Sequence, residues 1–305
     1  MEQTEEQLKE TVREMYSKIA LQDKDQNAAS CCGATSCCGG DSIYSDKFEN
    51  FTIMAENYEG LEGYNPDADL ALGCGLPTQF AKIKKGDVVI DLGSGAGNDC
   101  FVARAETGET GKVIGIDFTE AMLNKARTNA EKLGFNNVEF RFGDIEKMPV
   151  SDNYADVVVS NCVLNLVPNK KNVFAEIQRV LKAGGHFSIS DIVLVGNLPA
   201  KAKHVAALYA GCVSGAIEKA DYLKLVEEAG FVNITLQKDR EIAIPDAILK
   251  EYLSDAEIAE FRASNAQVRS ISVYAEKAGG VVTAEKAIEE APKAEACCTP
   301  GGGCC

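Results

Sequence analysis

The sequence predicts an α/β fold with a mostly parallel, seven-stranded sheet and helices on both faces. Short apolar strands alternate with amphipathic helices between residues 88 and 191, and the first strand runs into a glycine-rich loop. Acidic residues follow the second and third strands. This order predicts a parallel sheet, because each helix returns the chain to the edge at which the previous strand began.

The elements of the first part follow from local patterns. Residues 4–20 place apolar side chains at helical spacing, which predicts an amphipathic helix, and residues 24–45 read as a loop. Strands are expected at 88–92, 112–117, 138–142, 155–160 and 186–191, with helices up to about Thr107, over 119–133 and over 172–181. Thr119 is a candidate N-cap, and Ala183-Gly184-Gly185 is expected to end the third of these helices.

Two further helix–strand units and a tail complete the chain. We expect helices at 220–229 and 246–264, followed by strands at 232–237 and 268–275. Residues 278–305 consist mainly of Ala, Glu, Lys, Gly and Cys, a composition that buries no core and predicts disorder. The predicted organisation is an N-terminal helix and cysteine-rich segment (1–74), an α/β domain (75–277) and a disordered tail (278–305).

Composition limits the possible partners. The formal net charge is -15, which argues against nucleic acid and anionic membranes as partners. No apolar run is long enough to span a bilayer and no leader pattern is seen, so we expect a cytoplasmic protein, taken to be a monomer. With only two histidines, the chain is poorly supplied for histidine-based metal sites or catalytic dyads.

Eight of the twelve cysteines stand in four adjacent pairs: Cys31-Cys32, Cys37-Cys38, Cys297-Cys298 and Cys304-Cys305. In a reducing compartment they indicate ligands or redox groups rather than a disulfide framework. Vicinal thiolates select soft metals and metalloids. A zinc site formed by the two N-terminal pairs is an alternative, although the spacing is not C-x-x-C. The C-terminal pairs either capture a metalloid or shuttle electrons, or belong to a degenerate tail.

The loop Asp91-Leu92-Gly93-Ser94-Gly95-Ala96-Gly97 predicts a cofactor site. Its glycines allow backbone to approach a ligand closely, and a helix N-terminus follows. Asp117 ends the second strand, where an acid accepts hydrogen bonds from ribose hydroxyls, and Asp144 follows the third strand. The G-x-G-x-G spacing differs from that of dinucleotide enzymes, and an acid before the loop suits a ligand that carries an amino-acid cation.

Three solitary cysteines lie in loops on the side where such a cofactor binds. Cys162 follows the fourth strand, Cys74 stands between two glycines, and Cys212 follows the fifth strand and a helix. Ligands in open α/β sheets sit beyond the carboxyl ends of the strands, so three thiols from three loops can enclose a small trivalent centre. Cys100 lies inside the first crossover helix, where we expect it to pack in the core.

The run from Val88 to Ser190 resembles class I S-adenosylmethionine-dependent methyltransferases, which have a Rossmann-like fold. Four shorter runs extend this resemblance to arsenite S-adenosylmethionine methyltransferases: Gly73 to Pro77, Asp91 to Asp99, Ser160 to Leu166 and Cys212 to Ala216. The resemblance covers residues 44–231. It implies that the glycine loop holds the methionine part of S-adenosylmethionine, while Asp117 and Asp144 contact ribose and adenine. The implied cofactor-binding set is Asp91, Gly93, Ser94, Gly95, Gly97, Asp117, Met122, Asp144, Ile145 and Asn161.

The same resemblance implies a role for the cysteines. It implies that Cys74, Cys162 and Cys212 bind trivalent arsenic and that one cysteine of the N-terminal segment takes part in redox turnover. Four cysteines compete for that last role, and we choose Cys38. The implied reaction transfers a methyl group from S-adenosylmethionine to trivalent arsenic, either arsenite or methylarsenite, in arsenic detoxification. A cellular thiol reductant of the thioredoxin or glutathione type completes the cycle.

Two other functions remain open at this point. A carbon methyltransferase acting on a quinone or another small molecule has a related sheet, but it does not need thiols at 74, 162 and 212 together. A thiol-based metalloid-binding protein without catalysis needs the thiols, but it has no use for the glycine loop and Asp117.

Overall fold

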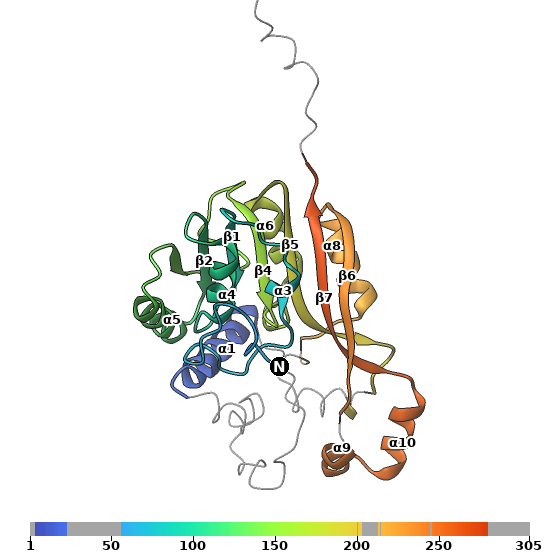
Figure 1. The fold of residues 1–305 in the computed structure, drawn as a ribbon. Helices are drawn as coiled ribbons and strands as arrows, with labels where there is room; N and C mark the ends of the chain where they lie inside the picture. Colours follow the sequence, from blue (N-terminus) through green and yellow to red (C-terminus); the bar gives the residue numbers. More distant parts are fainter. Residues whose placement is uncertain are drawn as a thin grey trace, which may run out of the picture.

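The computed structural model describes residues 4–22, 56–199, 201–202, 213, 215–244 and 246–279. Its centre is a seven-stranded sheet with the order β3-β2-β1-β4-β5-β7-β6 (Figure 1). The strands are β1 (Val88–Leu92), β2 (Lys112–Asp117), β3 (Val138–Phe142), β4 (Ala155–Asn161), β5 (Leu181–Val195), β6 (Phe231–Ile242) and β7 (Gln267–Lys277). The five strands β1 to β5 are parallel to one another, and β7 runs antiparallel to both of its neighbours, β5 and β6. The predicted fold class is confirmed.

Most of the helices lie where the apolar periodicity predicts them, with small shifts at their ends, but the short helices Pro77–Phe80 and Leu164–Leu166 were not predicted. They are α1 (Glu5–Ile19), α3 (Pro77–Phe80), α4 (Asn98–Thr107), α5 (Glu120–Leu133), the short 3-10 helix η2 (Leu164–Leu166), α6 (Lys170–Val180), α8 (Lys219–Glu228), α9 (Asp246–Tyr252) and α10 (Asp255–Ala263). In the described part of the chain, no helix is both long and apolar enough to cross a membrane.

Alternation along the strands builds the core on both faces of the sheet. Ile90 and Leu92 of β1 join the apolar cluster that contains α6 and α8, whereas Val89 joins the cluster that contains α4 and α5. Side chains of successive strand residues point to opposite faces, so a fully apolar strand reads as buried on both sides. Asp91 therefore shares the α4 face with Val89, and this places its carboxylate beneath the glycine loop.

Three local predictions need correction. The helix expected to end at Ala183-Gly184-Gly185 ends at Val180, because Leu181 already pairs with Ala155 and opens β5. The helix expected over 246–264 is divided into α9 and α10, because Ser254 and Glu257 form a capping box that starts a new helix. Thr119 occupies the N-cap position of α5, but its side chain forms no cap hydrogen bond.

Helix α1 docks against the end of the sheet at which the parallel strands finish. It lies below the strands, near α5, in Figure 1. Its Lys9 forms ion pairs with Asp144, at 2.6 Å, and with Glu146, both of which follow β3. These contacts bring a distant N-terminal segment to the predicted cofactor site.

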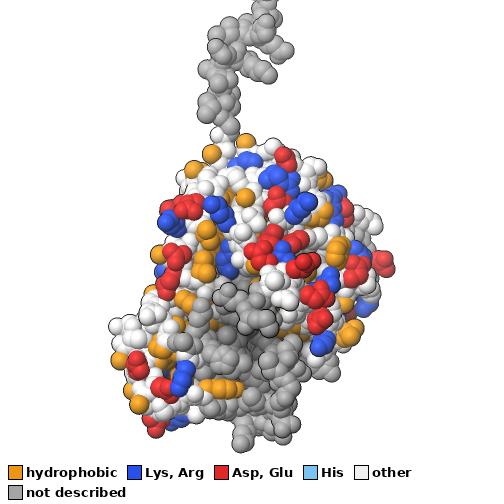
Figure 2. All heavy atoms as spheres, turned by 180° about the vertical axis from the view of Figure 1, so that it is seen from behind, with side chains coloured by type: hydrophobic (Ala, Val, Ile, Leu, Met, Phe, Trp, Pro, Cys, Tyr) orange, Lys and Arg blue, Asp and Glu red, His pale blue; other side chains and the backbone are white. Residues whose placement is uncertain are grey.

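The charged surface bears on the choice of partners. Figure 2 shows acidic and basic side chains intermixed on the face seen from behind, rather than gathered into a basic stripe. Four sets of predicted features lie outside the described residues: Cys38 and its neighbouring cysteines, the loop at 24–45, Cys212, and the tail from residue 280 with its cysteine pairs.

Candidate active site

A cavity opens at the carboxyl ends of β1, β2 and β4 and receives residues from α1 and the segment before β1. Of the residues predicted to bind the cofactor, it gathers Asp91, Gly93, Ser94, Gly95, Asp117, Met122, Asp144, Ile145 and Asn161. Gly97 does not line it and instead stands at the N-cap of α4. Cys162 also lines the cavity, so a predicted arsenic ligand and the predicted cofactor residues share one space.

Hydrogen bonds to residues of β2 fix the backbone of the glycine loop. The backbone N–H groups of Gly93 and Ser94 both donate to the carbonyl oxygen of Ile116, at 2.8 and 3.1 Å. The N–H of Gly95 donates to Oδ2 of Asp117 at 3.0 Å. Two buried polar atoms of this region, Ser94 Oγ and Asn98 Oδ1, have no hydrogen-bond partner among the described residues. Because buried polar atoms usually have partners, these two favour a polar ligand.

Three buried carboxyl groups line the cavity. Asp91, Asp99 and Asp117 are all largely buried, and none of them forms an ion pair with a lysine or arginine within the described residues. Burial raises the pKa of Asp91 well above its ordinary value, and the charge of Asp99 raises it further. Burial also raises the pKa of Asp99 to about 6 and raises that of Asp117. Acids held this way favour a cationic ligand, whose charge removes their mutual repulsion.

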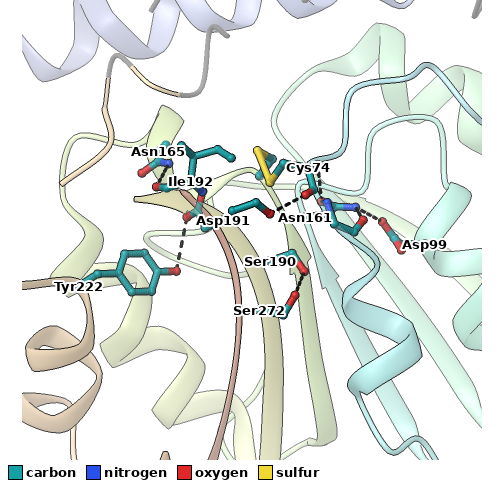
Figure 3. Close-up of a disulfide and its surroundings, with 12 residues drawn as sticks. Cys74, Asp99, Asn161, Asn165, Ser190, Asp191, Ile192, Tyr222 and Ser272 are labelled. Atoms are coloured by element: carbon teal, nitrogen blue, oxygen red, sulfur yellow. Dashed lines mark hydrogen bonds between the residues drawn. A yellow bond between two sulfur atoms is a disulfide. The ribbon is translucent and has the colours of Figure 1, made fainter. Parts of the chain in front are cut away.

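The structure brings Cys74 and Cys162 together as a disulfide, with 5.7 Å between their Cα atoms (Figure 3). They are 88 residues apart in the chain. Cys162 follows β4 with a φ of +63°, a left-handed conformation that is unusual for a residue with a side chain. Its N–H donates to the carbonyl oxygen of Ser190 at 2.8 Å, which fixes this backbone to β5. Strain of this kind gathers at functional sites.

The glycines on either side of Cys74 are explained by close packing. A Cβ on Gly73 would lie 2.6 Å from Nδ2 of Asn161, and one on Gly75 would lie 2.5 Å from Oγ of Ser190. The turn therefore lies directly on the ends of β4 and β5, and this contact leaves no room for a larger residue.

Hydrogen bonds hold the Cys74 turn from two sides. The N–H of Cys74 donates to Oδ1 of Asn161 at 3.0 Å, and Oγ of Ser270 on β7 donates to the carbonyl oxygen of Cys74 at 2.8 Å. Next along the chain, Oγ of Ser188 donates to the carbonyl oxygen of Pro77 at 2.9 Å. The turn that carries Cys74 and the residues after it are therefore hydrogen-bonded to three strands, β4, β5 and β7.

Comparison with known proteins agrees with this geometry. The methyltransferase domain family matches residues 83–230. An arsenite methyltransferase from Halobacterium salinarum is 39% identical over 85% of this chain and 65% of its own length, and one from Aquipseudomonas alcaligenes is 34% identical over 81% and 68%. The crystal structure of an arsenic(III) S-adenosylmethionine methyltransferase from Chlamydomonas reinhardtii has 34% identity and a TM-score of 0.58, with 68% of each chain covered.

The chain belongs to the arsenite methyltransferase family. It spans 65% of the Halobacterium relative and 68% of the Aquipseudomonas relative, so both of these proteins contain sequence that the matched part of the chain does not cover.

The other predicted cysteines of this arsenite methyltransferase family member divide into two groups. Cys100 is fully buried in the core as predicted, and its Sγ donates to Oδ2 of Asp91 at 3.2 Å. Burial raises the pKa of this thiol well above its ordinary value, so it is a poor thiolate. Cys212 and Cys38 lie outside the described residues. Val213, which follows Cys212, is fully buried in the same apolar cluster as Cys74 and Cys162.

Sequence reasoning missed several residues of the site. Tyr58, Asp69 and Lys9 line the cavity, yet they come from segments that carry no motif. Asp99 also lines it, and for this residue a signal was available: it is an acid in the first turn of the helix that follows the glycine loop. The other three could not be found from the sequence, because their neighbours in space lie dozens of residues away along the chain.

Proposed function

We propose that this protein transfers a methyl group from S-adenosylmethionine to trivalent arsenic held by the thiolates of Cys74, Cys162 and Cys212. One observation carries the proposal: Cys162, which is paired with Cys74, lines an acid-lined cavity at the carboxyl end of a methyltransferase-type sheet. A methyl donor and a thiol-bound acceptor can thus share one enclosed space, which is the geometry that group transfer needs.

The cavity residues suit S-adenosylmethionine, which supplies a methyl group activated by its sulfonium centre. Asp91, Asp99 and Asp117 offer carboxylates for its positive groups and ribose hydroxyls. Ser94 Oγ and Asn98 Oδ1 offer buried polar atoms that lack a protein partner in the described structure. Met122 and Ile145 give the apolar walls that a planar base requires.

The reduced form of the cysteine pair suits arsenic as substrate. Cys74 and Cys162 are close enough to bond to each other, so their thiolates can also bind one arsenic atom between them. A third thiolate from Cys212 is supported by the burial of Val213 in the same cluster. Thiolates are soft ligands that favour a soft metalloid and increase its electron density, which makes its lone pair a better nucleophile.

The reaction needs no general base, because the attacking lone pair carries no proton. The role of the protein is to hold arsenic in line with the methyl group and to exclude water. His186 serves the fold instead, since its Nε2 lies 2.6 Å from the carbonyl oxygen of Ala81.

Methyl transfer oxidises arsenic from the trivalent to the pentavalent state by two electrons. Oxidation of two thiolates to the Cys74–Cys162 disulfide releases two electrons, which return arsenic to the trivalent state. A dithiol or glutathione-type reductant then regenerates the thiols by thiol–disulfide exchange. We assign Cys38 to this relay of thiols, in keeping with the family resemblance.

Single-turnover methyl transfer at saturating arsenite, with a thiol reductant present, tests the proposal. Cys162→Ser and Cys212→Ser should each abolish transfer while the dissociation constant for S-adenosylmethionine stays unchanged, because serine keeps the size but offers a hard oxygen. Full activity in either variant would overturn the assignment. Tight binding of arsenite without any methyl transfer in the unmodified protein would instead identify a binding protein without catalysis.

A further inference from the structure

The side chain of Asn161, the last residue of β4, joins the cavity to the thiol-bearing turn. Its Oδ1 accepts hydrogen bonds from the N–H groups of Cys74, at 3.0 Å, and Gly75, at 3.3 Å. Its Nδ2 donates to the hydroxyl oxygen of Tyr58 at 2.6 Å and to the carbonyl oxygen of Gly75 at 2.8 Å, and it lies 3.2 Å from Oδ2 of Asp99. Figure 3 shows Asn161 between Cys74 and Asp99. The oxygen of this amide therefore contacts the cysteine turn, and its nitrogen lies between that turn and the Tyr58–Asp99 pair of the cavity.

Tyr58 completes this connection on the side of the cavity. It is 5% exposed, and its hydroxyl donates to the carboxylate of Asp99, at 2.9 Å from Oδ2 and 3.0 Å from Oδ1. The hydroxyl has one proton to give, so it meets the amide of Asn161 as an acceptor. A hydrogen-bonded chain therefore runs from Asp99 through Tyr58 and Asn161 to the backbone of Cys74. In a buried site, such chains are mutually strengthening.

We propose that Asn161 is a positioning residue that couples cofactor binding at Asp99 to the redox state of the Cys74–Cys162 pair. The inference rests on the proposed function, since it takes the cavity as the S-adenosylmethionine site. Opening or closing the disulfide changes the covalent constraint on the turn that carries Cys74, and Asn161 holds that same turn through the N–H groups of Cys74 and Gly75. The Asn161 amide is bonded to that turn and has to follow it.

The direction of the coupling follows from which state is more ordered. The disulfide holds the Cys74 turn against Asn161, and Asn161 in turn holds Tyr58 and Asp99 in place. A binding site whose groups are already ordered loses less conformational entropy when the ligand binds. S-adenosylmethionine should therefore bind more tightly to the disulfide form than to the dithiol form.

Coupling of this kind is reciprocal, because the two equilibria form one thermodynamic cycle. Reduction consumes two electrons and two protons from a dithiol such as dithiothreitol, breaks the S–S bond, and yields two cysteine thiols and the oxidised dithiol. A threefold preference of the cofactor for the disulfide form lowers the reduction potential of the pair by about 14 mV, given about 30 mV per tenfold change for two electrons.

Calorimetric titration of the full chain with S-adenosylmethionine, in the oxidised state and after reduction with dithiothreitol, tests the coupling without arsenic. We expect an affinity at least about threefold higher in the oxidised protein, together with the matching shift in potential. Asn161→Ala should give the same affinity in both states. Tyr58→Phe keeps the ring in the core but removes the hydroxyl. The ratio of the affinity of the oxidised protein to that of the reduced protein should therefore also fall towards one.

Two variants separate this coupling from other effects. Ser270→Ala removes the hydrogen bond that β7 makes to the carbonyl oxygen of Cys74. Ser270 has no hydrogen bond to Asp99, so this variant should keep the difference in S-adenosylmethionine affinity between the oxidised and reduced states. Cys74→Ser cannot form the disulfide, so its affinity for S-adenosylmethionine should no longer depend on the redox state. That result would show that no other cysteine is responsible.

The outcomes are distinct from those that test the proposed function. Equal affinities in the two states of the unmodified protein, or loss of the ratio in Ser270→Ala as in Asn161→Ala, would overturn the role of Asn161 and leave methyl transfer untouched. An absence of S-adenosylmethionine binding in both states would instead overturn the proposed function, and the coupling with it.

Discussion

The two halves of the site are built in different ways. The cofactor half comes from consecutive strand ends and their loops, so that Asp91, the glycine loop, Asp117 and Asp144 follow each other along the chain. The thiol half is assembled from distant pieces: Cys74 before the domain, Cys162 after β4, and the segment after Cys212. The first half therefore depends on local geometry, and the second on close packing of segments that the sheet brings together.

The largest effect on stability is expected at Gly75, where the thiol half is packed closely against β5. In Gly75→Ala the new Cβ meets both Oγ and Cβ of buried Ser190, at 2.5 and 2.6 Å, so the turn or β5 has to move. We expect a loss of up to about 3 kcal/mol in the free energy of unfolding of the reduced protein, and slower formation of the Cys74–Cys162 disulfide. Denaturant titration and thiol quantification measure the two effects.

Gly60→Ala is the matched control, because a Cβ at that position has no atom within 4 Å. If Gly75→Ala and Gly60→Ala have equal stability, the close contact of the Cys74 turn with β5 is not a constraint, and the contrast between the two halves fails.

A smaller effect, confined to the cofactor half, is expected from Asp117→Ala. The carboxylate holds the N–H groups of Gly95 and Thr119 and lines the cavity. Loss of a ribose partner should weaken S-adenosylmethionine binding by about 1–3 kcal/mol in calorimetry. The rate at which the Cys74–Cys162 disulfide forms should stay unchanged, and an unchanged dissociation constant would remove Asp117 from the site.

The pH dependence of cofactor binding sharpens the electrostatic side of the comparison. Burial raises the pKa of Asp99 to about 6, so the acid is ionised at neutral pH and becomes protonated as the pH falls through that value. A cationic ligand prefers the ionised carboxylate, and its affinity should therefore decrease as the pH drops from about 7.5 to 5.5. Titration calorimetry across this range should show a weaker decrease for Asp99→Asn, whereas identical slopes would exclude Asp99 as the titrating group.

The same shift has a consequence for stability without ligand. The folded pKa of Asp99 lies above the ordinary value of 3.8, so the folded state binds more protons than the unfolded state between those two values. This group therefore favours folding below about pH 4 and loses that contribution as the pH rises to 6. Asp99→Asn should be more resistant to unfolding than the unmodified protein at neutral pH, in the absence of S-adenosylmethionine.

The smallest effect is expected from removal of residues 280–305. Their composition gives little to bury, and β7, the last strand along the chain, ends before them. Single-turnover methyl transfer by the truncated protein should stay within about twofold of the full chain. A truncated protein without activity would show that cysteines of the tail, rather than only those of the loops, belong to the thiol half.

Much of the fold was predictable because its signals are local. The strand and helix positions from β1 to α5 match the predicted ranges within a residue or two, since buried parallel strands and amphipathic helices have distinct periodicities. The missed division of the helix over 246–264 has a local cause, the capping box of Ser254 and Glu257, whereas another error arises where a tertiary contact overrides local preference. Gly184-Gly185 looks like a helix end, yet pairing of Leu181 with Ala155 starts a strand earlier.

By itself the sequence determined the order of the elements, and it predicted the loop and acids of the cofactor half and the cysteines of the thiol half. Only the tertiary structure decided that Cys74 reaches Cys162 across 88 residues, that Tyr58 and Lys9 enter the cavity, and that Asn161 links the two halves. The reason is physical. A loop between a strand and its helix is shaped by neighbours in the chain, whereas contacts between distant segments depend on which faces the completed sheet brings together.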